Sequence, residues 1–221
     1  MSRPVLQTQG LTIRFGGHAA VNDVSCAFHA GSLTAIVGPN GAGKTTYFNL
    51  MSGQLPATSG SVRLDGEEVT GLSVAERARR GIGRAFQITN LFPNLSVAEN
   101  VRLAVQAKAR SAASLWSRWD HHTEWIDRAD LFLEEVNLQD KRDTAAAALP
   151  HGDKRKLEVA LMMALEPHVY MFDEPTAGMS VDEVPIVLDL IKRLKAAGDK
   201  TILLVEHHMS LVMDVCDRIA V

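Results

Sequence analysis

The sequence lacks the features that mark several large classes of protein. Only two cysteines occur in 221 residues, Cys26 and Cys216, too few to hold a fold together by disulfides and typical of a reducing compartment. The N-terminus has no continuous apolar core of the kind found in a secretory signal. Basic residues are not in excess either. The 23 Lys and Arg residues stand against 26 Asp and Glu, and the formal net charge of -3 does not favour nucleic-acid binding.

The sequence also lacks an apolar run with the composition that a membrane helix needs. Residues 24–43 carry no Lys, Arg, Asp or Glu and are long enough to span a bilayer, but they contain Gly31, Gly38, Pro39 and Gly41. We therefore expect a strand followed by a loop there, and we expect any role at a membrane to depend on a partner protein. The length favours one large domain, or a core with a subdomain, over two independent domains.

Residues 38–46 are the most informative stretch, because their glycines, lysine and threonine have the G-x-x-x-x-G-K-[ST] spacing of a phosphate-binding loop. The apolar run 33–37 before them predicts a buried strand, and residues 47–51 after them predict a helix that ends near Gly53. Strand, glycine-rich loop and helix is the order that this motif requires. The loop consists of Gly38, Pro39, Asn40, Gly41, Ala42, Gly43, Lys44, Thr45 and Thr46.

Each residue type in this loop has a physical reason to be there. Glycines let the backbone turn so that successive N–H groups point inward, and the start of the helix adds a partial positive charge, so that a polyphosphate is held. The Lys44 ammonium supplies a positive charge for the β and γ phosphates. The Thr45 hydroxyl supplies a ligand for magnesium.

Two further predicted strands end in residues suited to phosphate chemistry. The apolar run 168–172 ends at Asp173 and Glu174, and the β-branched run 201–205 leads to His207. Magnesium sites are built from acidic residues at the carboxyl end of a strand beside a phosphate-binding loop, so Asp173 is predicted to hold magnesium through water. Glu174 is placed to polarise the attacking water, and His207 to hydrogen-bond the γ phosphate.

Two weaker signals lie on either side of the loop. Strands predicted over 6–15 and 24–28 bring Phe15 to the edge of a glycine turn, where it either stacks on a flat base or packs in the core. A buried strand predicted over 81–86 delivers Gln87 to a loop. A glutamine at a strand end coordinates magnesium or orients a water, although most such glutamines are only solvated.

Residues 97–166 show a largely helical pattern and are interpreted as a helical subdomain. Ser-x-x-Glu capping signals that begin at Ser73, Ser96 and Ser180 predict three helix starts. Pro185 would fall in the second turn of the helix that starts at Ser180, where a proline is unfavourable. The pair His121-His122 has no second cluster of ligands nearby, so we reject zinc. A group of aromatic residues forms either a partner-docking surface or, as the usual burial of aromatics favours, part of the core: Trp116, Trp119 and Trp125.

Together these residues resemble the nucleotide-binding subunit of ABC transporters, and most of all the ATPases of branched-chain amino acid importers. The resemblance covers essentially the whole chain and implies an α/β fold. This is a P-loop NTPase (RecA-like) core with an N-terminal antiparallel β subdomain, over residues 1–94 and 167–221, and an inserted α-helical subdomain with the signature motif, over residues 95–166. The matching motifs are the adenine-stacking Phe15, Walker A at 38–46, the Q-loop Gln87, Walker B with the catalytic glutamate at 172–175, the D-loop at 177–180 and the switch histidine His207.

The resemblance also implies cofactors and partners. Two such subunits, identical or different, would close over two ATP molecules. Transmembrane permease subunits are the implied direct partners, a solute-binding protein is an indirect one, and no nucleic acid is involved. The implied location is peripheral, on the cytoplasmic face of the inner membrane, and the implied solutes are branched-chain amino acids or related small amides. The implied cofactors are ATP and Mg2+, with catalytic roles for Glu174, His207, Lys44 and Gln87 and metal ligation by Thr45, Gln87 and Asp173.

Two motifs depart from the family pattern. Where the ABC signature reads LSGGQ, residues 149–153 read Leu-Pro-His-Gly-Asp. Pro150 has neither the hydroxyl nor the backbone N–H that the family directs at the γ phosphate bound on the opposite subunit. His151 and Gly152, at the start of a predicted helix, are expected to make that contact instead. Ser180 replaces the D-loop aspartate, which puts the family's cross-dimer aspartate contact in question.

The C-terminus is a third difference. The family continues through a further hairpin and helix beyond the position of Val221. The resemblance therefore implies that the chain is truncated inside a strand, at residues 217–221, and that a sheet edge lies in the missing part.

Other functions are compatible with a phosphate-binding loop. A non-transport ABC ATPase acting on a macromolecular partner would carry coiled-coil insertions or tandem cassettes, whereas this chain has one cassette and no sustained heptads. A GTPase needs an Asn-Lys-x-Asp sequence to read guanine, and no asparagine here is followed by lysine. A small-molecule kinase leaves the arrangement of Asp173, Glu174 and His207 unexplained.

Overall fold

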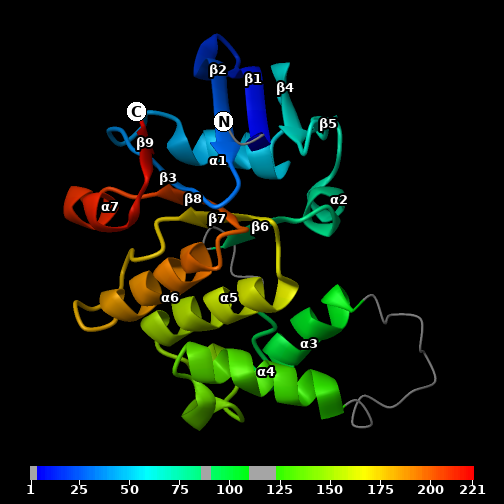
Figure 1. Cartoon of the computed structure of the whole chain (residues 1–221), viewed down its shortest axis with the longest axis vertical. Helices are drawn as coiled ribbons and strands as arrows, with labels where there is room; N and C mark the ends of the chain where they lie inside the picture. The colour runs from blue at the N-terminus through cyan, green and yellow to red at the C-terminus, as the bar shows by residue number, and fades with distance from the viewer. Residues whose placement is uncertain (1–3, 86–90, 110–122) are drawn as a thin grey trace. The chain divides into compact units, whose positions relative to one another are not determined.

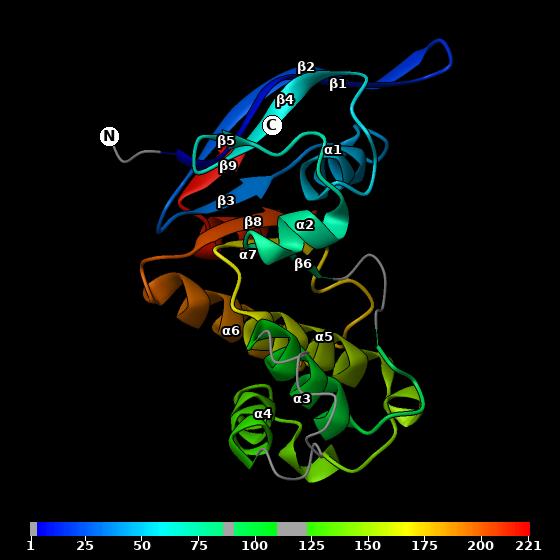
Figure 2. The same cartoon turned by 90° about the vertical axis from the view of Figure 1, so that its right-hand side faces the viewer.

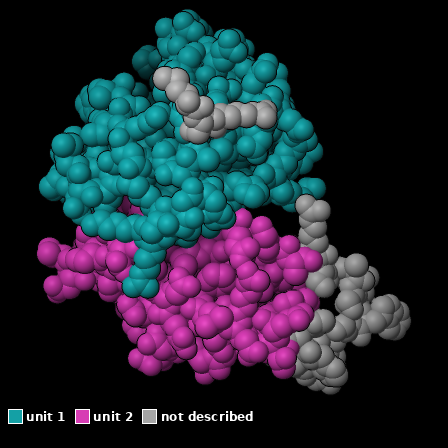
Figure 3. Space-filling view, viewed as in Figure 1, with its two compact units in different colours: residues 1–84, 167–174, 192–221 teal, residues 85–166, 175–191 magenta. Residues whose placement is uncertain are grey.

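The computed structural model describes residues 4–85, 91–109 and 123–221, whose elements are labelled in Figure 1. The chain divides into two compact units, which Figure 3 colours separately. The first unit comprises residues 1–84, 167–174 and 192–221, and the second comprises residues 85–166 and 175–191. None of the helices in the described ranges is long and apolar enough to cross a membrane.

An antiparallel sheet in the order β2-β1-β4-β5 covers one side of the first unit, as Figure 2 shows. The two strands predicted over 6–15 and 24–28 form a hairpin, and the second begins earlier than predicted, at His18, because residues 18–23 also pair with the first strand. The strands are β1 (Pro4–Phe15), β2 (His18–His29), β4 (Ser59–Leu64) and β5 (Glu67–Glu68).

A second sheet, in the order β6-β7-β8-β3-β9, forms the other layer of the first unit. Every residue of β3, β7 and β8 is buried, which agrees with their continuous apolar sequences and with the parallel pairing between them. The strand bounds are β3 (Leu33–Ile36), β6 (Ile82–Ala85), β7 (Val169–Asp173), β8 (Thr201–Val205) and β9 (Arg218–Ala220).

Helix α1 (Lys44–Ser52) packs in the core between these layers, where Phe48 and Met51 are fully buried. The helix ends as predicted at Gly53, whose left-handed conformation (φ 83°) lets its amide return to Leu50 O at 3.3 Å. The remaining helices of the first unit are α2 (Val74–Arg79) and α7 (Met209–Val215).

The second unit contains α3 (Val97–Lys108), α4 (Thr123–Glu135) and α5 (His151–Leu165), which pack against one another (Figures 1 and 2). Two short 3-10 helices, Gln139–Lys141 and Ala146–Ala148, lie between α4 and α5. Trp125 is buried in α4, in agreement with the favoured core interpretation, whereas Trp116, Trp119 and the His121-His122 pair lie outside the described residues.

Two of the three predicted helix starts are confirmed and the third is wrong. Ser73 and Ser96 each form a complete capping box at the start of α2 and α3. Ser180 does bond the Glu183 carboxylate, but α6 (Val184–Ala196) begins only after Glu183. The later start places Pro185 in the first turn, where a missing N–H leaves no helical hydrogen bond unmade.

Arg77 of α2 fastens the end of α1 to its surroundings. Its guanidinium donates to Leu50 O at 2.7 Å and Met51 O at 2.8 Å, two carbonyls of the last turn of α1, and to Thr70 O at 2.6 Å. The residue is only 2 % exposed, and burial lowers the pKa of its guanidinium.

Replacing this arginine should therefore be costly for stability. Arg77→Met should lower the free energy of unfolding by about 2–4 kcal/mol, because several buried carbonyls lose their donors. Urea unfolding followed by circular dichroism measures the loss. Arg80→Met is the matched control, because the Arg80–Glu67 pair is exposed and is expected to contribute no more than about 1 kcal/mol. Equal losses in the two variants would contradict this role for Arg77.

Candidate phosphate-binding site

The loop between β3 and α1 owes its path to glycines with positive φ angles: Gly38 (156°), Gly41 (82°) and Gly43 (88°). A side chain at Gly43 is excluded twice. Its φ is unfavourable for L residues, and a Cβ there would run into the carbonyl oxygen of Ala20. The backbone therefore turns sharply, and α1 begins directly after it at Lys44.

Hydrogen bonds hold Lys44 against this loop. Its ammonium donates to Gly38 O at 2.8 Å and to Pro39 O at 2.9 Å, and the residue is buried. The Ala42 amide donates to Pro39 O at 3.2 Å and tightens the same turn. A full positive charge is thus fixed beside the first amides of α1, which add a partial positive charge.

A pocket of about 420 Å³ opens at this loop. Most of its wall comes from the loop and the first turn of α1, and the rest comes from β2 and from the ends of β7 and β8. Its lining residues are Ala20, Asn40, Gly41, Gly43, Lys44, Thr45, Thr46, Glu174 and His207. The pocket therefore joins positive charge and backbone amides to a carboxylate and an imidazole.

Glu174 and His207 meet because β7 and β8 run parallel and in register, with Asp173 paired to Val205. The Glu174 amide donates to Val205 O at 3.0 Å, and its φ of 52° turns the chain at the strand end. Glu174 Oε1 and His207 Nε2 are 2.6 Å apart, and both side chains are more than one-third exposed. The pair is accessible from the pocket and hydrogen-bonded in the arrangement needed for proton transfer or water activation.

Asp173, the last residue of β7, lies beside the Thr45 hydroxyl. Thr45 Oγ1 and Asp173 Oδ1 are 3.4 Å apart. The second carboxylate oxygen, Oδ2, accepts a hydrogen bond at 2.8 Å from Nη2 of Arg84, and both side chains are about 5 % exposed. Burial lowers the pKa of the Arg84 guanidinium, and the charge of Asp173 partly opposes that shift.

Not every predicted site residue lines this pocket, and among those of the described core that do not are Gly38, Pro39, Ala42 and Asp173. Phe15 lies at the end of β1, opposite His18 in the hairpin, and is 53 % exposed, so it does not pack in the core. It does not line the pocket. Gln87 lies outside the described residues.

The segment that departs from LSGGQ starts α5, in the second unit. Pro150 is the residue before the helix, and His151 and Gly152 are its first two residues. His151 packs on the D-loop segment, because a Cβ added at Gly178 would lie 2.9 Å from His151 Nε2. Gly178 has a φ of 74° and leaves room for the imidazole.

A carboxylate already faces the start of α5. A Cβ added at Gly152 would run into the carboxylate of Glu183, so the two residues are in close contact. Hydrogen bonds from the amide and the hydroxyl of Ser180 lower the pKa of the Glu183 carboxyl, which keeps it ionised near neutral pH. The positive end of the helix is therefore approached by a negative charge from the same chain.

The residues present fit a nucleoside triphosphate with a magnesium ion. Gly43 keeps the loop open for amides to approach an anion, and Lys44 adds the charge that a polyphosphate needs. Thr45 and Asp173 offer oxygen atoms, which magnesium prefers. The described part of the chain contains no group of three or more His, Cys, Asp or Glu residues that could hold a metal ion. Magnesium takes few protein ligands when phosphates are present.

Sequence reasoning missed Arg84 and Glu183. The signal for Arg84 was available, because a charged residue inside a predicted buried strand needs a partner for its charge. The contact of Glu183 with Gly152 could not be predicted, because the capping spacing of Glu183 suggested a role in its own helix only.

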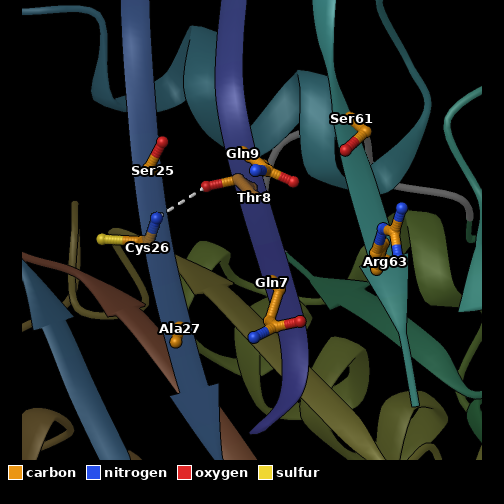
Figure 4. A pocket seen from close by; sticks show the side chains of 8 residues that line it. All are labelled: Gln7, Thr8, Gln9, Ser25, Cys26, Ala27, Ser61 and Arg63. Carbon is orange, nitrogen blue, oxygen red and sulfur yellow. Dashed lines mark hydrogen bonds between the residues drawn. The ribbon is translucent and has the colours of Figure 1, made fainter. Parts of the chain in front are cut away.

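A second pocket, of about 410 Å³, lies on the antiparallel sheet, where side chains of β1, β2 and β4 surround it (Figure 4). Thr8 Oγ1 accepts a hydrogen bond from the Cys26 amide at 3.0 Å and also bonds the Tyr47 hydroxyl at 2.7 Å. Among the lining residues Arg63 alone carries a charge. The pocket therefore offers no convergent charges, and we assign it no role in catalysis.

Comparison with known proteins shows the family to which the chain is similar. Residues 21–177 match the model of the ABC transporter family. The chain is 40% identical over 226 residues to the high-affinity branched-chain amino acid transport ATP-binding protein BraF of Pseudomonas aeruginosa, covering 100% of this chain and 89% of BraF. It is 38% identical, with the same coverage, to LivG of Escherichia coli, which has the same description. The lipopolysaccharide export system ATP-binding protein LptB of Escherichia coli is 31% identical, covering 96% of this chain and 84% of LptB.

Solved structures show the same fold. A nucleotide-free ATP-binding cassette from an ABC transporter superposes with a TM-score of 0.82 at 26% identity, covering 98% of this chain and 86% of that one. The ADP conformation of MJ1267, an ATP-binding cassette of an ABC transporter, gives a TM-score of 0.82 at 27% identity, covering 99% and 87% of the two chains.

The contact at Gly43 predicts a loss of nucleotide binding on substitution. Gly43→Ala should weaken binding of a fluorescent ADP analogue about tenfold or more, because moving the loop away from Ala20 misplaces amides that a phosphate needs. Gly198→Ala is the matched control, since Gly198 has a similar φ of 78° but open space around its Cβ position. Unchanged ADP affinity in the Gly43 variant would contradict the assigned site.

Proposed function

The chain belongs to the ABC transporter family, and from that premise we propose that it is the ATP-binding and ATP-hydrolysing subunit of an importer for branched-chain amino acids or related small amides. The observation that carries the proposal is the single pocket in which Lys44, the loop amides and the Glu174–His207 pair meet. Relatives described as branched-chain amino acid transport ATP-binding proteins support the solute class.

The site residues take distinct roles in hydrolysis. The loop from Gly38 to Thr46 binds the phosphates, with Lys44 neutralising charge on the β and γ groups. Glu174 accepts a proton from the attacking water at its carboxylate, and the hydrogen bond to His207 orients that carboxylate. With both ring nitrogens protonated, His207 also donates toward the γ phosphate through its second N–H, which stabilises the charge that develops there.

Magnesium would be held by Thr45 and Asp173, with Gln87 as a further ligand. When bound, the ion neutralises phosphate charge during transfer. Asp173 is buried and paired, so its carboxylate is held beside the Thr45 hydroxyl. Phe15 is exposed at the end of a hairpin and is assigned to stacking on the adenine base.

A second subunit of the same kind completes the site in this proposal, as a homodimer or a heterodimer. His151 and Gly152 at the start of α5 would contact the γ phosphate bound by the partner. The Glu183 carboxylate lies against Gly152, so it has to move aside when that phosphate arrives. Ser180, in place of the family's aspartate, holds Glu183 in its present position.

Transport itself depends on partners outside this chain. The helical subdomain and the loop that follows Gln87 are proposed to contact transmembrane permease subunits, with a solute-binding protein beyond them. This places the chain at the cytoplasmic face of the inner membrane as a peripheral subunit. The similarity to LptB, a lipopolysaccharide export protein, is lower in identity, and the importer is therefore the favoured assignment.

Dimer closure is the first consequence to test. In a Glu174→Gln variant the water is no longer activated, so magnesium-ATP should accumulate in closed dimers. Sedimentation velocity should show monomer with ADP and dimer with magnesium-ATP. A Glu174→Gln, Gly43→Ala double variant is the control and should stay monomeric. A Glu174→Gln variant that binds ATP tightly yet remains monomeric would contradict the composite site.

The role of His151 gives a second test. His151→Ala should lower the ATPase rate about tenfold or more while ATP affinity changes little, because a donor that acts in trans stabilises the reacting phosphate. His168→Ala, which removes an exposed histidine elsewhere, should leave both unchanged. Equal loss of rate and affinity, or no loss of either, would refute the assignment of His151.

A further inference from the structure

Arg84 is a buried charged residue on an edge strand of the second sheet. It belongs to β6, whose other three residues are buried, and its own side chain is 6% exposed. A guanidinium at such a position costs several kcal/mol unless it is paired and hydrogen-bonded. The contacts of Arg84 therefore indicate its role.

The guanidinium of Arg84 is clamped by α1 and the residues that follow it. Nη1 donates to Asn49 Oδ1 at 2.5 Å, to Ser52 Oγ at 3.0 Å and to Gln54 Oε1 at 2.9 Å. The guanidinium carbon also lies 5.6 Å from the centre of the Phe48 ring. The planar group is thus fixed before it meets its acidic partner.

This fixed guanidinium gives the two oxygens of the Asp173 carboxylate different partners. Oδ2 accepts from Arg84 Nη2 at 2.8 Å, and Oδ1 is left facing Thr45 Oγ1 at 3.4 Å. Rotation of the carboxylate would break a charge-assisted hydrogen bond in a buried setting. Asp173 therefore presents a single oxygen in a set direction.

We propose that Arg84 is a positioning residue that sets the metal specificity of the site, by restricting Asp173 to one oxygen toward a cation at Thr45. The proposal rests on the proposed function. Magnesium needs a compact, near-octahedral arrangement, whereas calcium accepts flexible geometry and carboxylates that bind through both oxygens. A carboxylate with one oxygen engaged by arginine suits magnesium and denies calcium the two-oxygen mode.

Charge alone makes a different prediction. Removing a positive charge near the site strengthens the binding of every divalent cation to a similar extent, because magnesium and calcium carry the same charge. The ratio of the affinity measured with Mg2+ to the affinity measured with Ca2+ cancels that contribution. The ratio therefore reports the positioning of Asp173 and is the quantity to measure.

The experiment is equilibrium binding of a non-hydrolysable ATP analogue to the whole chain, without metal, with Mg2+ and with Ca2+. In Arg84→Met the preference for Mg2+ over Ca2+ should fall about tenfold or more relative to the wild type, since loss of a residue that orients a metal ligand typically changes metal affinity by that amount. Binding without metal should change little. Arg80→Met, at an exposed ion pair of the same unit, should behave as the wild type.

Two further variants keep the test decisive if Arg84→Met folds poorly. Arg84→Lys keeps the charge but not the fork that joins Asp173 to α1, so the preference for Mg2+ should still fall. Asn49→Ala removes one anchor of the guanidinium and should lower the preference less.

The outcomes separate this inference from the proposed function. An unchanged Mg2+ to Ca2+ ratio in folded Arg84 variants would overturn the positioning role. So would a loss of metal-free nucleotide binding with no change in the ratio, because that result indicates a purely structural arginine. If the wild type binds the analogue no better with Mg2+ than without it, the proposed function fails first.

Discussion

The parallel register of β7 and β8 is the constraint on which the candidate site depends. Both strands are buried along their whole length, and Asp173 is paired with Val205. A shift by one residue would carry apolar side chains out of the core, so burial fixes the register. The same register brings Glu174 and His207, which are 33 residues apart in sequence, to a separation of 2.6 Å. Core packing thereby positions groups that contribute little to the core themselves.

A strained residue and a buried ion pair lie where this sheet meets the glycine-rich loop. Glu174 adopts a positive φ of 52°, which is unfavourable for a residue with a side chain. The hydrogen bond from its amide to Val205 O holds it in this conformation. Asp173 and Arg84 are buried ions that stabilise each other. Such features persist where the surroundings are well packed, and they also occur away from the pocket, as the buried Arg77 and the positive φ of Asn137 show.

The second unit differs from the first in the side chains that it buries. Its three main helices bury small and branched side chains, including Val101, Leu133 and Leu157, and α5 also buries charged residues such as Lys156 and Glu158. The positive end of α5 can be approached by either of two anions. The Glu183 carboxylate lies against Gly152 within the chain, and an anion from elsewhere would compete for the same positive helix end.

The sequence by itself determined the local features of this protein. The glycine-rich turn before α1, the buried strands β7 and β8 and the capping boxes at Ser73 and Ser96 follow from glycine spacing, apolar runs and short hydrogen-bonding patterns, and all appear in the structure. Tertiary structure alone decided the rest. The exposure of Phe15, the delayed start of α6, the Arg84–Asp173 pair and the contact of Glu183 with Gly152 depend on strand pairing and on packing between distant segments. Local sequence patterns do not encode such contacts, because the free energy that holds them comes from neighbours far away in the chain.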